Sequence, residues 1–158
     1  MSIEAVLFDF GRTIYDSEAG SLFPETIKTL ENLSQKGLKL GLLTVAETDD
    51  LDSRVKELDY LGLSGFFQSI DIVPRNTKGK DFTKLLKDFG MEEKTDNCLV
   101  VGDNLEREIT AGNTIGAFTV WTRQRLSDDW KPQNEIQTPK ATIEAIEELI
   151  PLIEKLNS

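Results

Sequence analysis

Residues 5–11 read AVLFDFG, a short apolar run that ends in an aspartate, Asp9, followed two residues later by Gly11. An apolar run of this length, bounded by a polar turn, is typical of a strand that is buried on both faces of a sheet. We therefore expect the chain to begin with a core strand that carries a carboxylate at its end.

Further apolar runs alternate with helical patterns along the chain. The runs lie at 38–44, 69–73, 98–102 and 117–122. Between them we expect helices from Pro24 to Gly37, from Asp49 or Asp50 onward, and over 82–89. A tail helix is expected to carry Ile143, Ile146, Leu149, Ile150 and Ile153 and to bend at Pro151. This alternation predicts an α/β fold, a three-layer, Rossmann-like, doubly wound sheet of about five parallel strands.

Length and composition fit one domain over residues 1–158, since 39% of the 158 residues are hydrophobic. The formal net charge of −10 without any basic run argues against nucleic acid and anionic membranes as partners. We find no signal peptide and no stretch of membrane-spanning length, so we expect a cytoplasmic protein. The polar stretch 123–139 is expected to be a surface loop rather than a mobile flap.

The chain has no histidine and one cysteine, Cys98. The absence of histidine excludes Ser-His-Asp and Cys-His catalysis and histidine-based metal sites. Cys98 lies in an apolar run and is expected to be a buried small hydrophobic residue. A disulfide within one chain needs two cysteines, so a reducing compartment is consistent with the sequence.

Polar residues gather where the predicted strands end. Asp9 ends the first strand, Thr44 the second, and Gly102 with Asp103 the fourth. Lys78 or Lys80 precedes the helix that leads to the fourth strand, and Glu108 follows Asp103 by five residues. Because ligands bind beyond the carboxyl ends of parallel strands, we expect these carboxylates, the hydroxyl and an ammonium group to lie on one rim.

The order of these motifs resembles the haloacid dehalogenase superfamily over nearly the whole chain. Residues 8–17, FDFGRTIYDS, resemble its first motif, and residues 100–103, VVGD, followed by Glu108, resemble its fourth. Thr44 is similar to the second-motif hydroxyl, and Lys78 or Lys80 to the third-motif lysine. We favour Lys78, because Lys80 is expected to lie in the following helix and to point to solvent.

This resemblance implies a Mg²⁺-dependent phosphomonoester hydrolase that works through an aspartyl-phosphate on Asp9. Thr44 and Lys78 would hold the phosphate oxygens, with Asn104 among the substrate-binding residues. The metal ligands implied are Asp9, the carbonyl of Gly11, Asp103 and, directly or through water, Glu108. The expected substrate is a phosphorylated small molecule or a phosphoprotein.

Gly11 departs from the pattern of the family, whose phosphatases usually carry there a second aspartate that serves as general acid and base. Glycine has no proton to donate, and Arg12 stays protonated. Losing this catalysis typically costs about 10²–10⁴-fold in rate. Three interpretations follow: a substrate with a good leaving group, another acid such as Glu18 or Glu47, or a catalytically weak domain that binds metal, phosphate or a protein.

The spacing of the motifs also predicts the absence of a cap domain. By the resemblance, members with a lid insert it after the first motif or between the second and third. Here residues 9–44 leave room for a turn and one helix, and residues 44–78 for one helix and one strand. We expect an open site that admits bulky substrates, or one that a neighbouring subunit of a homo-oligomer covers.

Three other families share single features with the chain. A response-regulator receiver domain would carry its acceptor aspartate on the third strand, but here that strand is followed by Pro74 and Arg75. Residues 9–11 match the metal-binding triplet of kinases, yet no glycine-rich loop precedes them and the chain is too short. Dehalogenases of the superfamily need no leaving-group acid, but they carry a cap.

Overall fold

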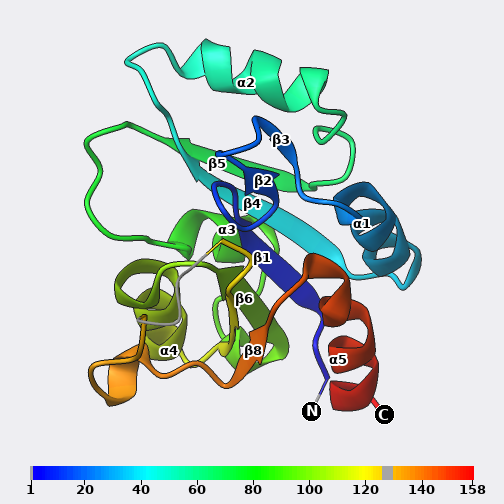
Figure 1. Ribbon diagram of the computed structural model, residues 1–158. Helices are drawn as coiled ribbons and strands as arrows, with labels where there is room; N and C mark the ends of the chain where they lie inside the picture. The colour runs from blue at the N-terminus through cyan, green and yellow to red at the C-terminus, as the bar shows by residue number, and fades with distance from the viewer. Residues whose placement is uncertain (1, 126–129) are drawn as a thin grey trace.

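The computed structural model describes residues 2–125 and 130–158, and Figure 1 shows their arrangement. Six parallel strands form one sheet in the order β5-β4-β1-β6-β7-β8. Its strands are β1 (Ala5–Asp9), β4 (Lys39–Val45), β5 (Ser69–Val73), β6 (Cys98–Gly102), β7 (Phe118–Thr122) and β8 (Ala141–Ile143). The strands β2 (Tyr15–Asp16) and β3 (Ser21–Leu22) form a separate antiparallel hairpin after β1.

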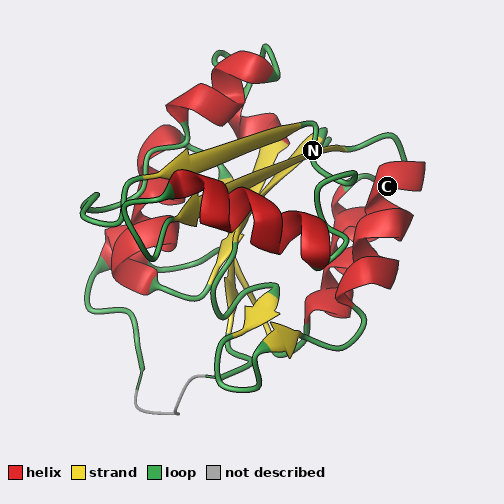
Figure 2. Cartoon of the chain, turned by 90° about the horizontal axis from the view of Figure 1, so that it is seen from above, coloured by secondary structure: helices red, strands yellow, loops and turns green. Residues whose placement is uncertain are grey.

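Helices connect the strands and cover both faces of the sheet (Figure 2). The α-helices are α1 (Thr26–Gln35), α2 (Leu51–Tyr60), α3 (Thr83–Asp88), α4 (Thr110–Ile115) and α5 (Leu149–Leu156). A π-helical turn over Leu105–Ile109 leads into α4. Short 3₁₀ helices lie at Thr95–Asn97, Glu135–Gln137 and Ile146–Glu148. The three layers therefore match the doubly wound arrangement predicted from the sequence.

The core divides into two halves because successive side chains of a strand point to opposite faces. On β1, Val6 and Phe8 join the cluster that includes residues of α1, α2 and α5. Ala5 and Leu7 join the cluster on the other face, with Leu85 and Leu86 of α3. Since both faces of β1 are buried, this strand reads as a continuous apolar run and lies in the middle of the sheet.

The sheet has its topological switch point at β1. The chain moves from β1 outward through β4 to β5, then returns to the other side of β1 and continues through β6, β7 and β8. Asp9 pairs in register with Leu43 on β4, and Phe8 with Val101 on β6. The ends of β1, β4 and β6 therefore lie next to one another at the place where doubly wound sheets bind ligands.

Several boundaries differ from the sequence prediction. The sheet has a sixth strand, β8, and Ile143 belongs to it rather than to the tail helix. Ile146 lies in a 3₁₀ turn, and α5 begins at Leu149, so Pro151 lies in the first helical turn, where proline is tolerated, and not at a bend. Pro24 precedes α1 by two residues. The hairpin β2–β3 was not predicted.

Part of the polar stretch 123–139 contains the short 3₁₀ helix noted above, and residues 126–129 lie outside the described part of the chain. Among the residues that the structure describes, no helix combines the length and apolar character needed to cross a membrane.

Truncating the core next to the site is expected to destabilise the fold. Phe8 is fully buried and meets Phe67 edge to face, with 5.9 Å between the ring centroids. Phe8→Ala should lower the free energy of unfolding by about 3–5 kcal/mol, measured by urea denaturation. Tyr60→Ala, at a position that is 90% exposed, should change it by less than about 0.5 kcal/mol. Equal effects of the two variants would contradict this description of the core.

Candidate functional site

Three carboxylates meet at the switch point. Asp9 ends β1, Asp103 follows β6 directly, and Glu108 lies in the π-helical turn. One oxygen of each lies within 4.8 Å of the others. Asp9 and Glu108 are buried, at 6% and 1% exposure. The sequence prediction that these residues converge is therefore met by the geometry of the sheet.

The position of Asp103 is fixed through its backbone and its neighbour. Its carbonyl accepts a 2.9 Å hydrogen bond from the Trp121 indole N–H on β7. Asn104 is the N-cap of the π-helical turn: its Oδ1 accepts from the backbone N–H groups of Glu106 and Arg107. The cap starts the turn immediately after the strand, and the turn carries Glu108 back toward Asp9.

Glu108 reaches the carboxylate group because Gly102 leaves room for it. A Cβ atom at position 102 would lie 2.5 Å from both Cβ and Cγ of Glu108. Real Cβ atoms do not approach other atoms so closely, so a larger residue at 102 would push Glu108 away. The glycine and the longer acid thus form one packing unit, and the Oε1 of Glu108 is left buried without a hydrogen-bond partner.

The protonation of the acids reflects their burial and mutual repulsion. Burial, reinforced by the negative charge of Asp9, raises the pKa of Asp103 to about 7. Burial, together with the charges of Asp9 and Asp103, also raises the pKa of Glu108. Like charges at this separation disfavour simultaneous ionisation, so the group favours a bound cation over three bare carboxylates.

Lys80 provides one positive charge at the site. Its Nζ donates a 3.0 Å hydrogen bond to Oδ1 of Asp9, and its side chain is 4% exposed. The hydroxyl of Thr13 approaches the other oxygen of Asp9 at 3.3 Å. A buried lysine in contact with a carboxylate is well placed to hold the oxygens of a phosphate next to Asp9.

This placement favours Lys80 over Lys78 as the lysine of the site. Lys78 is exposed and is not among the described residues that line the cavity, whereas Lys80 is. The prediction assumed that Lys80 already belonged to the helix. In fact α3 begins at Thr83, and the loop before it, with Gly79 at φ +71°, turns Lys80 inward.

A cavity of about 260 Å³ opens above the carboxylates. Its lining includes the predicted residues Asp9, Gly11, Thr44, Asp103, Asn104 and Glu108, together with Lys80. Thr44 is 1% exposed near the end of β4. A Cβ atom on Gly11 would meet no atom within 4 Å, so the place where the family's usual second aspartate would stand is open.

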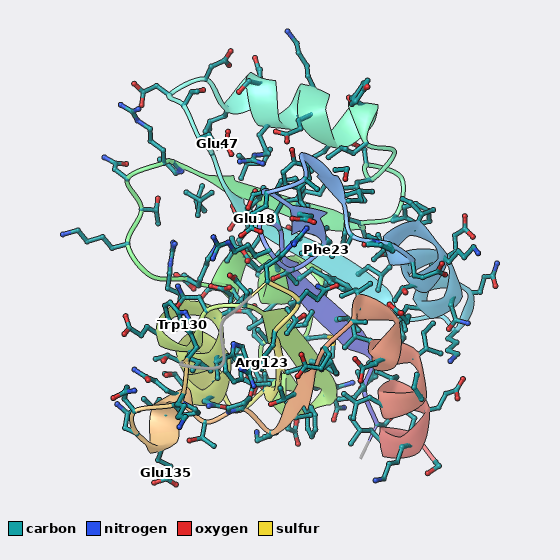
Figure 3. The ribbon with its side chains drawn as sticks, in the orientation of Figure 1. Glu18, Phe23, Glu47, Arg123, Trp130 and Glu135 are labelled. Atoms are coloured by element: carbon teal, nitrogen blue, oxygen red, sulfur yellow. The ribbon has the colours of Figure 1, made fainter. Side chains whose placement is uncertain are left out.

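The two acids considered as replacements lie on different segments. Glu18 belongs to the turn between β2 and β3, and Glu47 to the segment between β4 and α2 (Figure 3). Glu47 lines the cavity, while Glu18 forms ion pairs with Arg12 at 3.8 Å and Arg125 at 3.5 Å. Of the two, Glu47 is therefore the one that lies at the cavity.

Sequence reasoning missed Arg54, Tyr15 and Ser17, which also line the cavity. Tyr15 stacks on Phe10 with 4.9 Å between ring centroids, and the guanidinium of Arg54 lies 4.6 Å from the centroid of Phe10. Arg54 lies on α2, outside every motif. No local signal marks it, because its place in the wall depends on how α2 packs against the edge of the sheet at β5.

The residues present fit a divalent magnesium ion. Mg²⁺ prefers oxygen ligands in octahedral geometry and keeps some of its waters. Asp9, Asp103 and Glu108 offer carboxylate oxygens close enough to share one ion. The unpartnered buried oxygen of Glu108 is also an atom that a cation, or its bound water, would satisfy.

Comparison with known proteins gives a consistent result. A model of the haloacid dehalogenase-like hydrolases matches residues 3–116. A glyceraldehyde 3-phosphate phosphatase of Methanopyrus kandleri is 28% identical over 138 residues, which are 85% of this chain and 57% of that protein. A phosphoglycolate phosphatase of Aquifex aeolicus is 30% identical over 139 residues, 84% of this chain and 59% of that protein. The chain thus spans less than two thirds of these relatives.

Solved structures share the fold. The putative hydrolase YfnB of Bacillus subtilis, bound to magnesium, superimposes with a TM-score of 0.76 at 17% identity, covering 97% of this chain and 99% of that one. A phosphatase of Thermococcus onnurineus superimposes with a TM-score of 0.64 at 23% identity, covering 84% and 58%. The family model covers well over half of the chain, and the chain belongs to the haloacid dehalogenase-like hydrolases.

Proposed function

We propose that this protein is a magnesium-dependent phosphomonoester hydrolase that works through an aspartyl-phosphate on Asp9. The observation that carries the proposal is the meeting of Asp9, Asp103, Glu108 and Lys80 at the switch point of the sheet. Phosphoryl transfer depends mainly on positioning and on neutralising charge, and this site contains groups for both.

Each residue has a role in this proposal. Asp9 attacks phosphorus and forms the aspartyl-phosphate while the ester P–O bond breaks, and the leaving alkoxide or phenoxide takes its proton from water. A water molecule then attacks the aspartyl-phosphate, which releases inorganic phosphate and restores Asp9. Lys80 and Thr44 hold the phosphate oxygens, Lys80 through the ammonium group that contacts Asp9. Asp9, Asp103, Glu108 and the carbonyl of Gly11 hold the metal. When bound, Mg²⁺ neutralises the negative charge that the carboxylates and the phosphate bring together.

Gly11 restricts the substrates of such an enzyme. With no side chain at this position, no acid stands there to protonate the leaving group or to activate water. Esters with acidic leaving groups, such as aryl phosphates, are therefore expected to react faster than alkyl phosphates. The relatives named above act on small phosphorylated metabolites by their names, glyceraldehyde 3-phosphate and phosphoglycolate, which supports a small-molecule substrate.

Gly11 also favours a second candidate function, a domain that binds Mg²⁺ and phosphate without efficient turnover. The converging carboxylates and Lys80 would serve binding as well as catalysis. The two candidates differ in one respect: a binding module keeps its affinity for phosphate but shows no release of phosphate from esters.

The insertions at the site are small. Between Asp9 and Thr44 the chain holds the hairpin β2–β3 and α1, and between Thr44 and Lys80 it holds α2 and β5. These short insertions support the prediction that the site has no lid. Cytoplasmic location, a phosphoprotein substrate and a homo-oligomer that covers the site remain predictions.

The first experiment measures phosphate release from aryl and alkyl phosphomonoesters with Mg²⁺. Asp9→Asn should abolish turnover, because the amide cannot act as the nucleophile. Gly11→Asp should fit the open space at this position and should speed alkyl ester hydrolysis by up to about 10²–10⁴-fold. Gly65→Asp, at another glycine whose Cβ would meet nothing within 4 Å, is the matched control and should have no such effect.

If the wild type and Gly11→Asp both release no phosphate from any ester, the hydrolase proposal fails and the binding module remains. Turnover that persists in Asp9→Asn would refute Asp9 as the nucleophile.

The assignment of the lysine is tested by a pair of variants. Lys80→Ala removes the buried ammonium group in contact with Asp9 and should lower kcat/KM by about 10²–10³-fold, as removal of one charge-stabilising donor typically does. Lys78→Ala removes an exposed ammonium and should leave kcat/KM within about twofold. A larger loss in Lys78→Ala than in Lys80→Ala would contradict the assignment.

Metal binding should depend on pH. In the metal-free protein the raised pKa of Asp103, about 7 against an ordinary 3.8, means that the folded state binds a proton that the unfolded state releases. Stability should therefore fall as the pH rises from about 4 to above 7. Mg²⁺ replaces these protons, so the increase in Tm on adding MgCl₂ should be larger near pH 8 than near pH 5.

Asp103→Asn should lose most of this Mg²⁺-dependent increase in Tm, whereas Asp49→Asn, whose carboxylate is 87% exposed, should retain it. An increase of the same size in Asp103→Asn as in the wild type would count against the metal site.

A further inference from the structure

Arg54 is a buried cation at the site. It lies on α2, its side chain is 5% exposed, and it lines the same cavity as Asp9 and Thr44. Nη2 donates a 3.0 Å hydrogen bond to the carbonyl of Val45, the residue that follows Thr44. The guanidinium carbon also lies 4.6 Å from the ring centroid of Phe10, the residue that follows Asp9. The guanidinium thus contacts the residues that follow Thr44 and Asp9 in the chain.

Two glutamates lie within 4.0 Å of the Arg54 guanidinium, but its hydrogen-bonding capacity is not filled. Its Nη1 atom is buried without a hydrogen-bond partner. The ion-pair distances are long, 3.4 Å from Nη1 to Glu57 and 3.8 Å from Nη2 to Glu47, and the Glu47 side chain is 80% exposed. Buried charges are normally paired and hydrogen-bonded, because burying an unsatisfied donor is costly.

Lys80 differs from Arg54 in this respect. Both are cations with buried side chains in the cavity lining, but Lys80 donates directly to Asp9 at 3.0 Å. Arg54 keeps a donor that no described residue accepts. A buried guanidinium N–H without an acceptor, on a side chain that lines a reaction cavity, is suited to an anionic group of a ligand.

We propose that Arg54 is a specificity-determining residue that binds a carboxylate on the leaving group of the phosphomonoester. The inference rests on the proposed function, since it assumes that the phosphate is held between Asp9 and Lys80. The cavity of about 260 Å³ lies below the roughly 300–1,000 Å³ of drug-sized sites. A short phosphorylated carboxylic acid has room in this cavity.

A purely structural role is the competing explanation. Arg54 connects α2 to the end of β4 through Val45 and packs its side chain on Phe10. If this were its whole function, substitution would lower stability and would weaken all ligands equally. If Arg54 binds a carboxylate, its substitution instead changes the ratio of the dissociation constants of a carboxylate ligand and its neutral isostere.

The binding test uses two phosphonates that cannot be hydrolysed as phosphate esters, phosphonoacetate and phosphonoacetamide. They differ in one group, a carboxylate against an uncharged amide of the same shape. Calorimetry with saturating Mg²⁺ should give the wild type a roughly 10- to 100-fold preference for phosphonoacetate, the value of one charge-assisted hydrogen bond. Arg54→Gln should bring the two dissociation constants within about twofold.

Arg75→Gln is the matched control. Arg75 is an exposed arginine paired with Asp49 at 3.1 Å, and neither residue is in the cavity lining. This variant should retain the full preference of the wild type. Where Arg54→Gln does not fold, Arg54→Met removes the charge and keeps an unbranched apolar side chain at this buried position. Thermal unfolding checks the fold of each variant.

The parallel activity test compares kcat/KM for 2-phosphoglycolate with kcat/KM for its uncharged amide. The preference for the acid, expressed as the ratio of the two kcat/KM values, is expected to fall in the Arg54 variants. A wild type that hydrolyses aryl phosphates yet binds both phosphonates equally overturns the role of Arg54 and leaves the hydrolase function standing. A wild type that releases no phosphate but prefers phosphonoacetate, in a manner lost in Arg54→Gln, supports the carboxylate site and rejects the hydrolase. Equal weakening of both phosphonates in Arg54→Gln also overturns the proposal.

Discussion

The repulsion among three carboxylates, two of them buried and the third half-buried, is the constraint on which this site depends. Asp9, Asp103 and Glu108 place their oxygens within 4.8 Å, and burial with mutual repulsion raises the pKa values of the last two. Without a cation, such an arrangement opposes folding at neutral pH. Lys80 offsets part of the repulsion through its ion pair with Asp9, and Gly102 leaves space for the side chain of Glu108. The remaining charge is a reason to hold a divalent metal.

The sheet determines which residues share this constraint. With β1 central and the chain running outward on each side of it, the ends of β4 and β6 must flank Asp9. Residues separated by about half of the chain thereby become neighbours, although nothing local holds them together. The hydrogen bond from Trp121 to the carbonyl of Asp103 then links the site to β7, so that the outer strands also support its geometry.

The sequence predicted what depends on local pattern and on strand order. Apolar runs placed β1, β5 and β6 at or near their observed bounds, and the carboxylates followed, because parallel strands end at one edge. Features that depend on tertiary contacts were missed. The three-residue strand β8 is too short to show a period. Lys80 lies in the loop before α3, which begins only at Thr83, and this loop directs its side chain inward. Arg54 reaches the cavity wall because of the way α2 packs on the rest of the fold.

Gly11 and Arg54 both affect how the leaving group departs, Gly11 by removing an acid and Arg54 by offering a binding contact. Glycine removes the proton donor at the reacting centre, so the leaving group receives no help from an acid at that position. Binding energy from a part of the substrate that does not react can be used to orient the reacting centre. Arg54, held next to Phe10 and Val45, is placed to supply such energy if the substrate carries an anion there. In this proposal, binding of a substrate anion by Arg54, whose Nη1 makes no hydrogen bond within the described residues, compensates in part for the missing general acid at Gly11.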